Sequence, residues 1–251
     1  MSVFLATRSN LTRNEWDLRV QLAAAYRVAD HLGWSELIYT HISARIPGRD
    51  HHFLINPYGL RFDEVTASNL VKIDLDGNPV EPQRHKANKA GFVIHSAIHA
   101  ARADAGCVWH MHTLAGMAVS AQHEGLLPVH MYSHNFWQRL SYHDFEGPAM
   151  RLDERERLVA SLGVENQALI LRNHGLLTIG ETIPEAFIRF WRLNRSCEIQ
   201  LAAQATKLRL PPPEVCEASY QMGEEFLTDQ AGLGELEFDA IVRKLEPSYK
   251  N

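Results

Sequence analysis

The chain has 251 residues, of which 45% are hydrophobic and 22% charged, so it can bury a large core in one or at most two domains. A net charge of −5 provides no broad cationic surface, which argues against nucleic-acid binding. The apolar runs are shorter than the roughly 18 residues of a membrane helix, and Met1 to Asn10 show no signal-peptide pattern. Because the three cysteines have no metal or disulfide spacing, we expect a reducing, cytoplasmic location.

Hydrophobic periodicity predicts helices and short strands in alternation. A first helix begins at the capping box Thr12–Glu15 and ends at Gly33, and a second capping box, Thr182–Glu185, begins a long helix that should end near Leu208. Further helices are expected over 87–102, 113–123, 153–162 and 214–228, and strands over 41–46, 52–56, 70–74, 107–112, 142–145, 168–172 and 175–179.

The order of these elements predicts the fold class. Strands and helices alternate without a regular βαβ pattern, so we expect α/β layers around a mixed, largely antiparallel sheet. The sequence shows no convincing linker. We therefore expect one domain, with its main part over residues 1–210 and a C-terminal helical extension over 211–251.

Two histidines on one expected strand are the first candidates for chemistry. His110 and His112 are two positions apart, so both imidazoles point to the same face of the strand and can reach one ion. His174, at a turn after an apolar strand, could be a third ligand, and three imidazoles leave an open coordination position. The alternatives are hydrogen-bonded or surface histidines for the pair, and a polar turn residue for His174.

Seven motifs stand out in residues 15–205, namely Thr40-His41-Ile42-Ser43, Asn56-Pro57-Tyr58-Gly59, Thr66-Ala67-Ser68-Asn69-Leu70, Ala90-Gly91-Phe92, His110-Met111-His112-Thr113, Tyr142-His143-Asp144 and Arg172-Asn173-His174-Gly175. Together they resemble the class II aldolase/adducin family. The resemblance implies a three-layer α/β/α fold with a divalent metal on His110, His112 and His174. That metal is usually Zn²⁺, although Mn²⁺, Fe²⁺, Co²⁺ or Ni²⁺ also suit such ligands. It also implies a homotetramer with active sites between subunits.

The sequence departs from the aldolases of this family at the expected active site. Where those enzymes carry a glutamate that ligates the metal and acts as acid/base, this chain has Gly91. Their phosphate-binding serine pair falls on Lys89 and Ala90, and their Gly-Asn falls on Thr40 and His41. The chain is therefore more similar to the adducin head domain and its bacterial relatives than to the sugar-phosphate aldolases.

Two residues are candidates for proton transfer in place of the missing glutamate. On a helix, His95 lies one turn after Gly91 on the same face, so it could point into the site as an acid/base or an extra ligand. Tyr132 lies where the resemblance places a tyrosine that protonates the leaving oxygen. The alternatives are a hydrogen-bonded helix histidine for His95 and a core or interface aromatic for Tyr132.

We expect a small-molecule substrate to contact His41, Tyr58, Gly59, Lys89 and Arg172, the last two as cations for an acidic group. The resemblance predicts a metal-dependent carbon–carbon lyase, aldolase- or decarboxylase-like, acting on a small oxo- or hydroxy-acid or sugar derivative through a metal-stabilised enolate. A non-catalytic interaction module, as the adducin head is thought to be, is the alternative from another class. An epimerase or dehydratase is a third.

Overall fold

The computed structural model describes residues 13–48, 51–147, 151–228 and 232–251. Within these ranges no helix combines the length and the apolar character that crossing a membrane requires. Thr12, the expected cap of the first helix, lies outside them.

The described residues form one sheet of seven strands, in which β5 and β6 are parallel and all other neighbours antiparallel. This confirms the expected mixed, largely antiparallel sheet. Across the sheet the order is β3 (Val71–Ile73), β2 (Phe53–Ile55), β1 (His41–Arg45), β4 (Cys107–Met111), β7 (Gly175–Gly180), β6 (Ala168–Leu171) and β5 (Leu140–His143).

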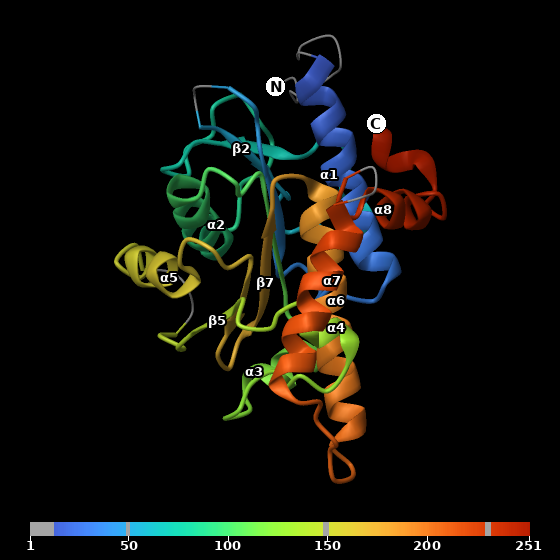
Figure 1. The fold of residues 1–251 in the computed structure, drawn as a ribbon. Coiled ribbons are helices and arrows are strands. Elements are labelled where there is room, and N and C mark those ends of the chain that lie inside the picture. Colours follow the sequence, from blue (N-terminus) through green and yellow to red (C-terminus); the bar gives the residue numbers. More distant parts are fainter. Residues whose placement is uncertain (1–12, 49–50, 148–150, 229–231) are drawn as a thin grey trace.

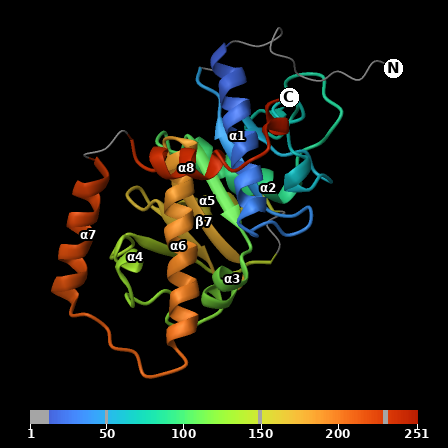
Figure 2. The ribbon, with the colours of Figure 1, turned by 90° about the vertical axis from the view of Figure 1, so that its right-hand side faces the viewer.

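Helices cover both faces of the sheet, so the expected three-layer α/β/α fold is confirmed. In Figure 1 the sheet is seen nearly edge-on, with α2 (Lys89–Ala101) and α5 (Glu154–Leu162) on one side and α1 (Arg13–His31) and α6 (Ile183–Ala203) on the other. Figure 2 shows α6 lying across the second face, with α7 (Pro213–Thr228) standing beside it. The remaining helices are α3 (Leu114–Ser120), α4 (Met131–His134), α7 (Pro213–Thr228) and α8 (Glu235–Val242), with 3-10 turns η2 (Phe62–Glu64) and η3 (Pro247–Lys250).

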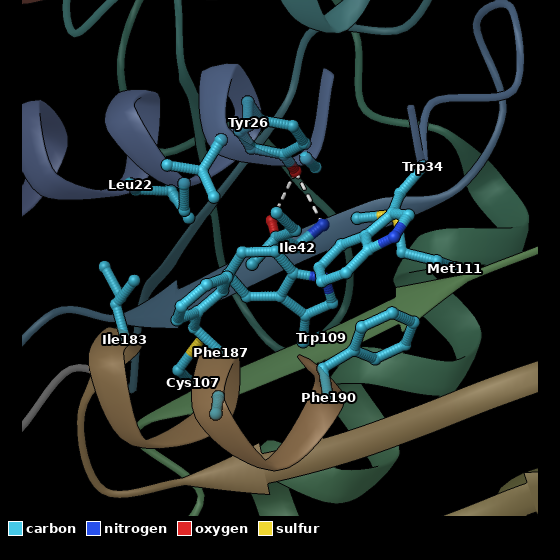
Figure 3. Close-up of a cluster of buried hydrophobic side chains, with 14 of the residues drawn as sticks. Leu22, Tyr26, Trp34, Ile42, Cys107, Trp109, Met111, Ile183, Phe187 and Phe190 are labelled. Carbon is cyan, nitrogen blue, oxygen red and sulfur yellow. Dashed lines mark hydrogen bonds between the residues drawn. The ribbon is translucent and has the colours of Figure 1, made fainter. Parts of the chain in front are cut away.

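The largest hydrophobic cluster lies between the sheet and the α1/α6 layer (Figure 3). Trp109 of β4 is fully buried, and its ring lies 5.6 Å from that of Phe187 and 6.1 Å from that of Phe190, between centroids. The buried Tyr26 hydroxyl of α1 donates to the Ile42 carbonyl and accepts from the Ile42 amide. Because both backbone groups of Ile42 are held, the position of β1 beside His41 is fixed.

Alternation along the strands then decides what faces the other layer. Ile42, Trp109 and Met111 belong to the α1/α6 core, so His41 and His110 point toward α2. Most of the rest of that second face is apolar and packs against α2 and α5, with buried polar side chains at Ser43 and His143. The candidate site is therefore built into a largely hydrophobic layer.

The structure differs from the sequence-based expectations mainly at short elements. The long helix α6 ends at Ala203 rather than near Leu208, and β5 begins at Leu140 rather than at Tyr142. The short helices α4 and α8 were not predicted. Phe238 anchors α8 by packing its ring 5.4 Å from that of Phe187, a tertiary contact that a segment rich in acidic residues does not reveal.

Candidate metal centre

One strand and one turn bring three imidazoles together. His110 is the fourth residue of β4, His112 follows the end of that strand, and His174 lies in the turn between β6 and β7. Their potential ligand nitrogens all lie within 4.8 Å of one another. The ring centroids are 4.9 Å apart for His110 and His112, 4.9 Å for His110 and His174, and 4.7 Å for His112 and His174.

The turn that carries His174 is shaped by its two neighbours. Asn173 has a φ of +54°, a left-handed conformation that asparagine tolerates better than most residues. A Cβ on Gly175 would lie 2.7 Å from the Met111 carbonyl oxygen and 3.0 Å from His112 Cδ2. Glycine is required there because the β7 backbone passes so close to the histidine pair.

Hydrogen bonds at Nδ1 fix which nitrogen His110 and His112 present to the centre. His110 Nδ1 lies 2.9 Å from the Leu176 carbonyl oxygen, and His112 Nδ1 lies 2.7 Å from Glu36 Oε2. A carbonyl or carboxylate oxygen only accepts, so each Nδ1 carries the proton and each Nε2 presents a lone pair. Such outer-shell oxygens commonly orient metal-binding histidines.

The donor chemistry fits a divalent metal. The Nε2 atoms of His110 and His112 lie 3.1 Å apart, so two lone pairs face each other unless a cation or proton lies between them. Burial and the neighbouring imidazoles lower the pKa of His110 well below its usual value and that of His174 to about 4, which keeps both rings unprotonated at neutral pH. Three imidazole ligands leave room for a further ligand, as catalytic zinc sites do.

His41 lies directly beside this triad, and His95 lies behind it. His41 is the cross-strand partner of His110, with ring centroids 5.2 Å apart. His95 is fully buried, with Nε2 2.8 Å from His41 Nδ1 and Nδ1 2.6 Å from Ser43 Oγ. His95 therefore reaches the triad through His41. A Cβ on Gly91 would lie 2.5 Å from His41 Cδ2, so the His41 ring fills the space that a side chain at Gly91 would need.

Tyr132 lies elsewhere in the single chain. It belongs to α4, which packs on α6 and α7, and its ring lies 5.2 Å from that of His130 and 5.3 Å from that of Trp191. The α6 layer covers the face of the sheet opposite to His41 and α2. Tyr132 and the triad of the same chain are thus on different sides of the sheet.

The expected substrate-binding residues are spread more widely. Arg172 donates to the Gln122 carbonyl oxygen at 2.6 Å, and its Cζ lies 4.2 Å from the centroid of the Tyr142 ring. Arg172 also lines one hollow together with Phe145 and His174. Tyr58 and Gly59 form an exposed turn after β2. The backbone amide of Tyr58 donates to the Lys86 carbonyl oxygen. The side chain of Lys89 lies outside the described part of the chain.

Sequence reasoning missed three residues that contact the site. Glu36 holds His112 from a loop that carries no recognisable pattern, so no signal pointed to it. The other two residues are Ser43 and His99, whose Oγ and Nε2 atoms lie 2.7 Å apart. Their spacing in the sequence could have identified both. Ser43 is two residues after His41 on one strand face, and His99 is one turn after His95 on one helix face.

Comparison with known proteins agrees with this architecture. Residues 20–201 match the Class II Aldolase and Adducin N-terminal domain. A Caulobacter vibrioides protein that bears the name of an aldolase class 2 protein is 51% identical over 199 residues, covering 79% of this chain and 77% of its own. Rat alpha-adducin is 42% identical over 91% of this chain, which spans only 33% of the adducin.

Solved structures show the same fold over nearly the whole chain. An aldolase II superfamily protein from Pseudomonas syringae is 48% identical with a TM-score of 0.92, covering 97% of this chain and 99% of its own. The L-fuculose 1-phosphate aldolase of Glaciozyma antarctica is 27% identical with a TM-score of 0.82, covering 100% of this chain and 97% of its own. The chain belongs to the class II aldolase and adducin family.

Proposed function

We propose that this protein is a divalent-metal-dependent carbon–carbon lyase that acts on a small oxo- or hydroxy-acid or a related sugar derivative. The observation that carries the proposal is the convergence of His110, His112 and His174 within 4.8 Å, with hydrogen bonds directing two Nε2 lone pairs inward. The likeness to an L-fuculose 1-phosphate aldolase supports the class of reaction. Zinc is the proposed metal and the cytoplasm the proposed location.

Each residue of the triad has a defined part in this proposal. His110, His112 and His174 hold the ion, and Glu36 keeps His112 in the tautomer that binds. The ion would supply the positive charge that stabilises a substrate oxygen as negative charge develops on it. Phe145 lines one hollow with His174, and its ring lies 6.3 Å from that of His174.

A second copy of the chain completes the proposed site. Tyr132 lies on the opposite side of the sheet from the triad of its own chain, so it could donate a proton only to a substrate at the triad of a neighbouring subunit. Leu37 follows Glu36 in the sequence and is 73% exposed. Leu114 comes two residues after His112 and is 81% exposed. Exposed apolar side chains around a site favour a covering partner. We propose a homo-oligomer, a tetramer as in the resemblance.

The substrate class follows from what the chain has in place of the aldolase residues. Gly91 supplies no carboxylate, and Lys89 and Ala90 supply no serine hydroxyls for a phosphate. We propose that Arg172 and Lys89 meet an acidic group and that His41, Tyr58 and Gly59 line the path to the triad. Aldol cleavage and decarboxylation of an oxo-acid both develop charge on a carbonyl oxygen, so this ligand set serves either.

The test is metal analysis followed by a substrate screen. Wild type, purified without chelators, should hold about one divalent metal per chain. His110→Ala should hold little, and His31→Ala, an exposed histidine at the end of α1, should match wild type. Oxo- and hydroxy-acids are then assayed for aldehyde and CO₂ release. Wild type that takes up no metal would refute the proposal. Dehydration or epimerisation of the same substrates would reassign the reaction.

A non-catalytic interaction module is the second candidate, and one observation favours it. Rat alpha-adducin resembles 91% of this chain, while the chain spans only 33% of the adducin, so a chain of this kind occurs as one part of a much longer protein. A triad that remains empty in the presence of micromolar zinc, with the fold intact, would support this candidate over the lyase.

A further inference from the structure

A continuous chain of hydrogen bonds leads from the edge of the triad into the protein interior. His41 Nδ1 lies 2.8 Å from His95 Nε2, and His95 Nδ1 lies 2.6 Å from Ser43 Oγ. Ser43 Oγ lies 2.7 Å from His99 Nε2, and His99 Nδ1 lies 2.9 Å from the Ala105 carbonyl oxygen. The four side chains are at most 4% exposed. We call these four residues the imidazole relay.

The far end of the relay fixes the direction of every bond in it. The Ala105 carbonyl only accepts, so His99 Nδ1 donates. Burial lowers the pKa of His99 to about 3, so this ring is neutral and its Nε2 accepts the single proton of Ser43. Ser43 Oγ must then accept from His95 Nδ1, which leaves His95 Nε2 to accept from His41 Nδ1.

The near end of the relay is a lone pair on His41 Nε2. Burial lowers the pKa of His95 well below the ordinary value, so this ring is neutral and its Nε2 accepts the proton on His41 Nδ1. With Nδ1 donating to His95, Nε2 of His41 carries no proton, and it has no hydrogen-bond partner among the described residues. His41 pairs across the strands with His110, yet it lies outside the group of three whose nitrogens share the 4.8 Å limit.

Burying polar rings on a sheet face is costly unless each is hydrogen-bonded, and most of the other residues on that face are apolar. The relay hydrogen-bonds every inner ring nitrogen and leaves one, His41 Nε2, beside the triad without a partner among the described residues. Core packing alone does not require such an arrangement. Gly91 adds a second observation. A side chain there would lie 2.5 Å from His41 Cδ2 and 3.0 Å from Nε2, so glycine is what allows His41 its place.

We propose that His41 is the acid/base residue of this site and that His95, Ser43 and His99 are positioning residues that hold it as the Nδ1–H tautomer. The proposal rests on the proposed lyase function. In aldol cleavage His41 Nε2 accepts the proton of the substrate hydroxyl, whose O–H electron pair forms the new carbonyl. The carbon–carbon bond breaks, and its electron pair passes to the carbonyl oxygen of the other fragment. His41 then returns the proton to carbon.

The first test reads tautomers by ¹⁵N NMR of histidine-labelled, zinc-saturated protein, with assignments from single His→Gln variants. His41, His95 and His99 should each show a protonated Nδ1 and an unprotonated Nε2. Ser43→Ala should mix the tautomers of His41 and His95. The matched control is Ser96→Ala, which removes another buried serine hydroxyl from the same layer. A protonated Nε2 on His41 in wild type, or tautomers that Ser43→Ala leaves unchanged, would overturn the relay.

The second test separates a base from a metal ligand and from a structural residue. His41→Gln should keep the wild-type zinc content and lower turnover by about 10² to 10⁴-fold, with substrate KM little changed. Gly91→Ala should retain zinc but shift the His41 resonances and lower turnover. Loss of zinc from folded His41→Gln would make His41 a ligand and overturn its assignment as the base. Wild type without zinc would instead refute the proposed function, and the NMR pattern would still decide the relay.

Discussion

The contact between Glu36 and His112 allows a quantitative test of the metal centre that depends on no substrate. Glu36→Gln keeps the size of the side chain but removes the negative charge that accepts the Nδ1 proton of His112 at 2.7 Å. Loss of such an outer-shell partner weakens metal binding by about 10- to 100-fold. The Glu36 side chain is 39% exposed and that of His112 21%, so solvent screens the contact. We therefore expect the lower end, about tenfold, or ~1.4 kcal/mol.

Competition with a zinc-binding dye measures this change directly in the folded protein. Glu36→Asp should fall between wild type and Glu36→Gln, because it keeps the charge on a shorter side chain. The exposed Glu156→Gln, on the outer face of α5, changes the same charge away from the triad and should bind zinc as wild type does. Equal zinc affinity of Glu36→Gln and wild type would refute the reasoning that Glu36 holds His112 for the metal.

Three further predictions concern stability, each measured by urea denaturation. Arg19→Leu should lower the free energy of unfolding by about 3–5 kcal/mol, because it leaves Glu81 without the buried guanidinium that it meets at 2.5 Å; an unchanged midpoint would show that the network contributes little. Phe190→Ala should cost about 3–5 kcal/mol through the cavity beside Trp109, and a loss under 1 kcal/mol would mean that the core collapses around it. Stability should also fall from pH 6.5 toward pH 4.5: the folded pKa of His99 is about 3, below the unfolded value of about 6.5, so the unfolded chain binds the proton first. His99→Gln should flatten that slope.

The sequence predicts the histidine triad better than it predicts what surrounds it. His110 and His112 follow from a spacing of two on a strand, which is local geometry and independent of the rest of the fold. His174 could be proposed because it ends an apolar strand at a glycine turn. The resemblance to a family added the expectation that these three residues meet. Their nitrogens do lie within 4.8 Å of one another.

The contacts around the triad depend on distant segments and could not be predicted in the same way. Glu36 reaches His112 across 76 positions of the chain. The face that carries His95 and His99 was visible from helical spacing, and the sequence directed His95 into the site. Only the packing of α2 against β1 shows that His41 stands between His95 and the triad. Short helices such as α8 were missed for a similar reason, since one buried side chain, Phe238, holds them.

The charge of the site connects the substitution at Gly91 with the choice of substrate. Three imidazole ligands would add no negative charge to a divalent ion, whereas the missing carboxylate would have added one. Among the described residues, Glu36 is the carboxylate that hydrogen-bonds to a histidine of the triad, His112. Because the Glu36 side chain is 39% exposed, solvent partly screens its charge. The His41 beside the triad is neutral as well. In a site of this kind, the protein would neutralise little of the positive charge of the ion, so the ion would attract a negatively charged substrate strongly. Such a site should therefore discriminate more strongly in favour of an anionic oxo- or hydroxy-acid, and against a neutral sugar, than a site with a carboxylate ligand.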